Sequence, residues 1–280
     1  MRRSERRLQA RAARPGTLGE SGDRTGTTFW DEYWTSLRLP VEIEKSTSLL
    51  VSAITDVFDR FLQSPRPLSV LEIGGAPGQY GAYIHRRLGH SITILDSSPI
   101  GCEKARENFK LLGIPARVFE GDMFDPPPDL GRFDAVFSLG LIEHFDDVVG
   151  AVAAHVALVS PGGLLVLGIP NFSGINGALM RRLAPSFLAA HQTETMRERA
   201  WETFESRLPL DRLARGFIGG FEPSTFWRCE RSTVRNRLLH QALWGLSSVL
   251  RRDEARFLRR ANSRFWSAYL MGVYRVGLAG

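Results

Sequence analysis

A chain of 280 residues can form one large domain, or one domain with a lid, and bury a substantial core. Its hydrophobic fraction of 43% and charged fraction of 24% are ordinary for a globular protein. No apolar run reaches the roughly 18 uncharged residues of a membrane span, and no apolar segment follows the arginine-rich start, as one would in a secretory signal. Cys102 and Cys229 lie far apart, without a CxxC motif or a Cys/His cluster near either. We therefore expect a cytoplasmic protein with reduced thiols and no metal site.

The net charge of +6 is unevenly distributed along the chain. Residues 228–280 contain eleven arginines against three acidic residues, so the remainder is close to neutral. A basic end of this kind suits an anionic membrane surface, nucleic acid or an acidic substrate. It is also found as a solvated face in proteins that use arginine almost exclusively over lysine, as this chain does.

The first part of the chain divides into a tail and a helical segment. Residues 1–28 contain arginines and scattered glycines but few large apolar groups, so we expect a disordered basic tail. An aromatic cluster at Phe29–Trp34 follows, and apolar residues then recur at helical spacing over 49–62. We expect residues 29–67 to form an N-terminal helical cap.

Beyond residue 67, short apolar runs alternate with helical segments, which predicts a parallel sheet with crossover helices. The expected strands are Ser69–Ile73, Ser91–Leu95, Ala116–Phe119, Phe133–Ser138 and Leu164–Ile169. The expected helices are Gln79–Leu88, Ile100–Leu112 and Phe145–Val159, the last closed by a turn at Ser160–Gly163. These elements predict an α/β fold with helices on both faces of the sheet.

The C-terminal part has weaker patterns. Leu208–Arg215 is predicted as a helix, and Phe221–Cys229 and Ser267–Val276 are strand candidates on either side of a basic helical stretch. We expect one domain over 68–230 with a lid at 172–207. Residues 231–280 are expected to form basic amphipathic helices and a last strand.

The segment from Val70 to Tyr80 carries the strongest chemical signal. An apolar strand ends in Glu72, turns through Gly74-Gly75-Ala76-Pro77-Gly78, and enters a helix. Small residues let the backbone approach a ligand closely, and a helix N-terminus favours an anionic group such as a carboxylate. A tight strand-to-helix turn can be glycine-rich for structural reasons alone, so the turn is not decisive by itself.

Acidic residues follow the next two strands in the same way. Asp96 ends the second strand, about 20 residues after the glycine turn, where a carboxylate can accept both hydroxyls of a ribose. Asp122 and Met123 follow the third strand, where they could flank an adenine ring. Each acid alone is more typical of a helix cap or loop, but the ends of successive parallel strands meet at one edge of the sheet. We therefore expect Glu72, Asp96 and Asp122 to converge around a nucleoside-sized hollow.

These motifs resemble those of the class I S-adenosylmethionine-dependent methyltransferases over about residues 68–171. The family pattern acid-x-Gly-x-Gly-x-Gly is matched by Glu72, Gly74, Ala76 and Gly78, with alanine in place of the middle glycine. The resemblance implies a Rossmann-like, seven-stranded, mostly parallel sheet with an antiparallel pair last. It also implies S-adenosyl-L-methionine as cofactor, bound by Glu72, Gly74, Gly75, Ala76, Gly78, Tyr80, Asp96, Ser97, Asp122, Met123, Ser138 and Gly140.

The implied reaction is direct displacement at the sulfonium methyl group of the cofactor. The protein then mainly aligns the acceptor and excludes water, and it needs a base only where the acceptor arrives protonated. His144, in the loop after the fourth strand, is the candidate base, although a histidine that holds this loop in place by hydrogen bonding is the more ordinary interpretation. Glu143 is expected to pair with it or to face solvent. His191 is expected mainly to have a surface role, with a contribution to the lid as the alternative.

Residues 232–264 contain a basic amphipathic helix, whose apolar stripe is Val234, Leu238, Ala242, Leu246 and Val249 or Leu250. With Trp244 nearby, this pattern suits peripheral contact with a membrane and a lipid-linked acceptor. The ordinary alternative is a helix packed on the domain or on a second copy in a homo-oligomer. The fourth strand is not followed by Asn-Pro-Pro-Tyr or Asp-Pro-Pro-Tyr, so we do not expect a nucleic-acid base as acceptor.

Two other function classes share this pattern. A nicotinamide-dependent oxidoreductase is disfavoured because Glu72 stands at a position that is normally apolar in dinucleotide sites, and the turn does not fit GxGxxG. A non-catalytic protein could keep the fold and bind membrane or RNA through its basic end. The leading prediction is a methyltransferase acting on a small-molecule or lipid-like acceptor.

Overall fold

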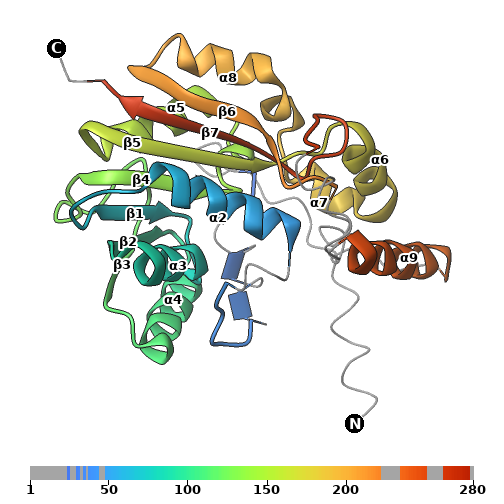
Figure 1. Ribbon diagram of the computed structural model, residues 1–280, viewed down its shortest axis with the longest axis horizontal. Helices are drawn as coiled ribbons and strands as arrows, with labels where there is room; N and C mark the ends of the chain where they lie inside the picture. Colours follow the sequence, from blue (N-terminus) through green and yellow to red (C-terminus); the bar gives the residue numbers. More distant parts are fainter. Residues whose placement is uncertain are drawn as a thin grey trace.

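The computed structural model describes residues 24–25, 30–31, 34–35, 37–43, 48–221, 234–250 and 261–277 (Figure 1). Of the predicted tail at 1–28, only Arg24 and Thr25 belong to this part, so the prediction of disorder for the rest lies outside the described residues.

The described residues form a seven-stranded sheet of order β3-β2-β1-β4-β5-β7-β6. Its strands are β1 Ser69–Ile73, β2 Ser91–Asp96, β3 Ala116–Glu120, β4 Phe133–Leu139, β5 Val159–Pro170, β6 Leu210–Ile218 and β7 Tyr269–Val276. The first five run parallel, and β7 runs antiparallel between β5 and β6. The Rossmann-like sheet with an antiparallel pair last is therefore confirmed.

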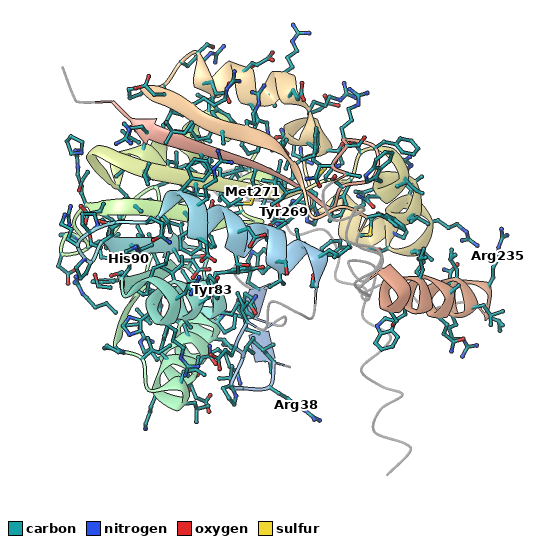
Figure 2. All side chains as sticks on the ribbon, viewed as in Figure 1. Arg38, Tyr83, His90, Arg235, Tyr269 and Met271 are labelled. Atoms are coloured by element: carbon teal, nitrogen blue, oxygen red, sulfur yellow. The ribbon has the colours of Figure 1, made fainter. Side chains whose placement is uncertain are left out.

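Helices cover both faces of this sheet (Figure 1). One face packs on α2 Leu49–Phe61, α3 Gln79–Leu88 and α4 Pro99–Leu112, and the other on α5 Val148–Ala157, α6 Gly174–Leu183 and α8 Glu198–Glu205. Because successive side chains of a strand point to opposite faces, β1 contributes Val70 to the first core and Leu71 to the second. Figure 2 shows Tyr269 and Met271 on β7, and both belong to the core beneath α2.

Local sequence sets several helix ends. The Ser48 hydroxyl accepts from the Val51 amide at the start of α2, and Ser98 caps α4 in the same way, with Pro99 in its first turn. Gly89 and Gly113 end α3 and α4 in the left-handed conformation. These signals explain why the predicted bounds of α2, α3 and α4 agree with the structure to within a residue.

The predicted helix Leu208–Arg215 is wrong, because this segment is strand β6. Its leucines, arginines and alanine favour a helix locally, but it is an edge strand paired along its length with β7. The register shifts between Arg212 and Ala214, so the exposed Leu213 sits in a bulge that breaks the alternation typical of a strand.

Two further predictions concern the end of the sheet. Ser267–Val276 is confirmed as β7, whereas residues 222–229 of the candidate Phe221–Cys229 lie outside the described residues, and β6 is the strand beside β7. The predicted turn Ser160–Gly163 lies within the long strand β5, where the register against β4 jumps between Phe133 and Ala135.

The segment expected as a lid is helical and partly built into the core. It comprises α6, α7 Pro185–Ala189, the 3-10 turn η3 Thr193–Met196, and α8. Its large apolar side chains Met180, Met196 and Trp201 are buried.

Helix α9 Val234–Leu250 extends beside this region, and Figure 2 shows Arg235 pointing away from the rest of the protein. Among the described residues, no helix combines the length and the apolar character that a membrane crossing requires.

Candidate functional site

The glycine turn joins the carboxyl end of β1 to the start of α3. Gly74 and Gly78 have positive φ angles of 64° and 84°, which other residues rarely adopt. The Gly74 amide donates to the Leu95 carbonyl at 2.8 Å and ties the turn to the end of β2. A side chain at Gly78 would also meet the ring of Phe109, since an added Cβ would lie 2.4 Å from it. At Gly74 and Gly78 the turn therefore has backbone without side chains at the edge of the sheet.

Asp96 links the second strand to this turn. Its Oδ2 accepts from the Ala76 amide at 3.1 Å, and its Oδ1 accepts from the Ser98 amide at 2.9 Å. Burial raises the pKa of the Asp96 carboxyl, against the lowering effect of these two bonds. The structure thus brings Asp96 and the glycine turn into one site, as predicted.

The Glu72 side chain is buried between the glycine turn and helix α3. Its Oε2 accepts from the Gly81 amide in α3 at 3.0 Å, and burial raises the pKa of the carboxyl to about 8. Gly75 must remain small, because an added Cβ would lie 2.4 Å from Cγ of Glu72. Asp96 is close enough to raise the pKa of Glu72 further, so these two carboxyls are neighbours.

Asp122 does not converge with the other two carboxyls. It is exposed, and its Oδ1 accepts from the Phe124 amide of its own loop at 3.0 Å. Met123 is buried in the core beside the end of β2, and Ser97 is exposed. The expected convergence of three carboxylates is therefore reduced to a pair, because a short loop lets Asp122 satisfy its own backbone.

Three other predicted residues lie around the same edge. Ser138 is buried, and its hydroxyl bonds to Nε2 of His155 in α5 at 2.9 Å, so it points away from the turn. Gly140 has a φ of 74° and its amide donates to the Gly168 carbonyl at 2.7 Å. Tyr80 packs edge-on against Phe58 of α2.

Described residues of the N-terminal segment contact this edge from outside. Trp34 packs at Gly101 in α4, where an added Cβ would lie 3.0 Å from the indole. The Ser98 hydroxyl donates to Oδ1 of Asp31 at 2.5 Å, and Trp30 packs edge-on against His144 with ring centroids 5.3 Å apart. These described residues therefore contact the end of β2, the start of α4 and the loop after β4.

A buried polar cluster lies in the loop after β4. Glu143 and His144 belong to the 3-10 turn η2 Ile142–His144, and His191 reaches them from the segment between α7 and η3. One ligand atom from each of the three residues lies within 4.8 Å of the others. Glu143 is 0% exposed and His191 is 6% exposed, so the expected solvent-facing and surface positions of these two residues are wrong.

Burial also controls the protonation of this cluster. It raises the pKa of the Glu143 carboxyl to about 8, and it lowers the pKa of His144 to about 4 and that of His191 to about 3. Both imidazoles are therefore neutral at pH 7. His191 was missed as a site residue because its distance from His144 along the chain gives no signal of their contact.

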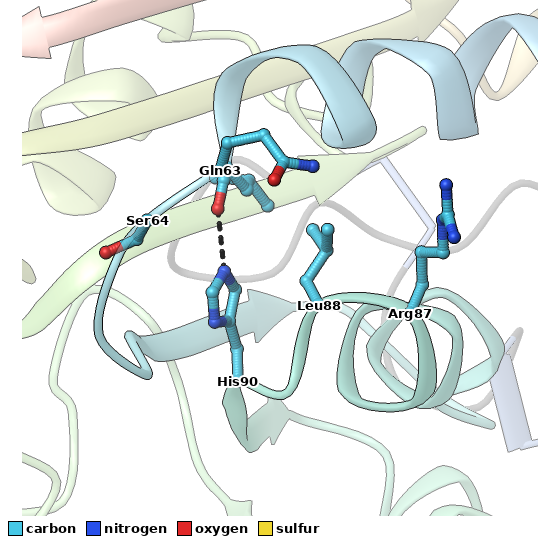
Figure 3. A pocket seen from close by; sticks show the side chains of 6 residues that line it. Gln63, Ser64, Arg87, Leu88 and His90 are labelled. Carbon is cyan, nitrogen blue, oxygen red and sulfur yellow. Dashed lines mark hydrogen bonds between the residues drawn. The ribbon is translucent and has the colours of Figure 1, made fainter.

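A cavity of about 230 Å³ lies at the opposite edge of the sheet (Figure 3). It is lined by Gln63, Ser64, Leu88 and His90, among others, and Nε2 of His90 bonds to the Leu62 carbonyl at 2.7 Å. Ligands of open α/β sheets bind at the carboxyl ends of the strands, so this cavity is not part of the candidate site.

The comparisons with known proteins agree with this geometry. Residues 70–163 match the family described as methyltransferase domain. The ubiquinone biosynthesis O-methyltransferase of Methylocella silvestris is 27% identical over 161 residues, which cover 53% of this chain and 61% of that protein. The chloroplastic 2-methyl-6-phytyl-1,4-hydroquinone methyltransferase 2 of Oryza sativa subsp. japonica is 34% identical over 100 residues, 35% of this chain and 28% of that protein.

Residues 70–163 are therefore similar to a methyltransferase domain. The alignments span less than two thirds of these two relatives. The solved structure of the [4+2]-cyclase SpnF shares the fold of the methyltransferase domain, with a TM-score of 0.60, 14% identity, and coverage of 95% of this chain and 100% of that chain. The cyclase shows that this fold alone does not determine the reaction, so the chemistry must be argued from the site.

Proposed function

We propose that this methyltransferase domain transfers the methyl group of S-adenosylmethionine to a small-molecule or lipid-like acceptor. The observation that carries the proposal is the hydrogen bond from the Ala76 amide to the Asp96 carboxylate. This bond joins the glycine turn and the carboxylate that would bind the ribose hydroxyls in one site. The family match favours this cofactor over a nicotinamide.

The residues around the turn fit the cofactor. Each carboxylate oxygen of Asp96 accepts one backbone bond and keeps capacity for another, so it can also accept a ribose hydroxyl. The Ala76 methyl group lies against α4, because an added Cβ on Gly101 would be 3.0 Å from it. The alanine that departs from the family pattern therefore leaves the open side of the turn free.

When bound, S-adenosylmethionine supplies a methyl group already activated by its sulfonium. The contributions of the chain are to hold the nucleoside at Asp96, to align the acceptor and to exclude water. Trp30 and Leu141 serve the last purpose: Trp30 covers His144, and Leu141 lies over Gly74, where an added Cβ would be 3.1 Å from its side chain. His144 lies in the loop after β4, which is where we place the acceptor.

A direct test combines binding with methyl transfer. We expect calorimetry to show micromolar binding of S-adenosylmethionine and S-adenosylhomocysteine, and no response to NADH. We expect label from methyl-labelled S-adenosylmethionine to reach a lipid hydroquinone or a related phenol in an extraction assay. Absence of cofactor binding by the folded protein would contradict the proposal. NADH binding in its place would support the oxidoreductase alternative.

Helix α9 supports a lipid-like acceptor. The described side chains of its apolar stripe are exposed, with Val234 62%, Leu238 61% and Leu246 42% exposed, and Trp244 is 56% exposed. Leu239 and Leu243 on another side of the helix pack on the core. The helix therefore packs on the domain only through the side that carries Leu239 and Leu243. The apolar stripe lies on the exposed side of the helix. Exposed apolar rows beside arginines are typical of membrane-surface helices.

Replacing Leu238 by aspartate should weaken binding to vesicles containing an anionic phospholipid by at least about fivefold, since burying one leucine contributes about 1.5–3 kcal/mol. Co-sedimentation with the vesicles measures the effect. Leu111→Asp is the matched control, because Leu111 on α4 is 55% exposed and lies far from α9. Vesicle binding equal in the wild type and Leu238→Asp would argue against membrane contact, and a change in oligomeric state with Leu238→Asp would indicate a second copy as the partner.

A further inference from the structure

The buried cluster of Glu143, His144 and His191 has a chemical feature that the methyl-transfer proposal leaves unused. Both carboxylate oxygens of Glu143 lack a hydrogen-bond partner among the described residues, although the side chain is fully buried. Nε2 of His144 is 3.9 Å from Oε1 of Glu143, which is too long for a hydrogen bond. A buried carboxyl without partners is costly, so this arrangement calls for a ligand.

The two histidines are oriented by their outer nitrogens. Nδ1 of His144 bonds to the Ala190 carbonyl at 3.0 Å, and Nδ1 of His191 bonds to the Phe187 carbonyl at 2.8 Å. Since a carbonyl only accepts, each Nδ1 must carry the proton, which leaves the lone pair of each ring on Nε2. Metal-binding histidines are oriented in this way, with one nitrogen donating to a carbonyl or carboxylate and the other binding the ion.

The spacing and surroundings also suit an ion. Two atoms bound to one ion by bonds of about 2.1 Å lie at most about 4.2 Å apart. The distance of 3.9 Å from Nε2 of His144 to Oε1 of Glu143 is within this limit. The ligand atoms of all three residues lie within 4.8 Å of one another, so small side-chain rotations would bring every pair within the limit. Trp30 packs against His144, and Phe172 and Phe187 pack against His191, so aromatic rings surround the cluster.

We propose that Glu143, His144 and His191 bind a divalent transition-metal ion of the zinc type beside the methyl acceptor. Two imidazoles and one carboxylate suit such an ion, and three protein ligands leave a position open. Hard ions such as Mg²⁺ prefer oxygen ligands, so the set selects against them.

This inference rests on the proposed function for its chemical role. An ion bound by these three residues would polarise an acceptor hydroxyl group at its open coordination position and lower the pKa of that hydroxyl. The acceptor's O–H bond then breaks and its proton passes to the bulk solvent, while an oxygen lone pair forms the new O–CH₃ bond. The electrons of the C–S bond return to sulfur, which leaves neutral S-adenosylhomocysteine. The substrate class is therefore a hydroxylated acceptor, such as a phenol or hydroquinone.

Metal binding can be measured without turnover. After incubation with excess Zn²⁺ and desalting, we expect about one zinc per chain by elemental analysis, and excess Mg²⁺ should not displace it. Co²⁺ should give visible absorption bands of a low-symmetry site. Glu143→Gln and His191→Gln should each weaken zinc binding by at least about tenfold, since even outer-shell partners contribute that much. His85→Gln is the matched control, because His85 lies on α3 with its Nδ1 bonded to the His90 carbonyl, and it should retain one zinc.

The outcomes separate this site from the proposed function. Calorimetry with S-adenosylhomocysteine and thermal unfolding should show that Glu143→Gln is folded and still binds the cofactor, since glutamine keeps the size of the side chain. Zinc binding without cofactor binding would leave the metal site standing and contradict the methyltransferase proposal. A wild type that retains no zinc or cobalt, or a Glu143→Gln variant that retains zinc as tightly as the wild type, would overturn the metal site.

Discussion

Asp96→Ala should weaken the binding of S-adenosylmethionine by at least about tenfold. Charge-assisted bonds from a ribose diol to a carboxylate contribute about 1.5–3 kcal/mol, and about 1.4 kcal/mol corresponds to a factor of ten. The alanine also removes the acceptor of the Ala76 amide, so the glycine turn loses one of its two links to the end of β2 and keeps the backbone bond from Gly74 to Leu95. Both effects weaken the binding of S-adenosylmethionine.

Calorimetry with S-adenosylhomocysteine measures this change on the folded variant. Asp129→Ala is the control, because Asp129 is an exposed aspartate of the loop after β3 and should leave affinity within about twofold. Asp122→Ala decides a separate question: a loss as large as that of Asp96→Ala would show that the exposed carboxylate turns toward the nucleoside. Unchanged affinity in Asp96→Ala would reject the location of the cofactor site.

Trp201→Ala should lower the free energy of unfolding by about 3–5 kcal/mol, as for other large aromatic residues removed from a core. Trp201 is 0% exposed, and its Nε1 donates to the Thr195 carbonyl at 2.8 Å. Its ring lies over β7, where an added Cβ on Gly272 would be 2.6 Å from Cζ3. The loss is a large part of the 5–15 kcal/mol that is usual for a domain.

Urea unfolding followed by circular dichroism checks this value. Leu213→Ala should change the free energy of unfolding by less than about 1 kcal/mol, because Leu213 is 43% exposed in the bulge of β6. An effect of Trp201→Ala as small as that of Leu213→Ala would mean that α8 is a separable lid and not part of the core.

Local patterns in the sequence were sufficient for the central elements. The bounds of β1 and α3 were predicted without error because an apolar run between a proline-rich turn and a glycine turn allows few alternatives. The glycine turn and Asp96 were also found in this way, since the acid and the turn each follow directly from a strand. The segments that were misassigned depend on partners far away along the chain. Helical propensity favoured a helix for Leu208–Arg215, and pairing with β7 overrode this preference.

The sequence by itself therefore determined the alternation of strands and helices, the order of the glycine turn and Asp96, and the resemblance to a methyltransferase domain. Only the tertiary structure decided that Asp122 caps its own loop, that the stripe of α9 faces outward, and that His191 joins Glu143 and His144. The physical reason is that periodicity and turn chemistry act between near neighbours. Burial and the meeting of distant side chains depend on which surfaces pack together, and no local pattern encodes that packing.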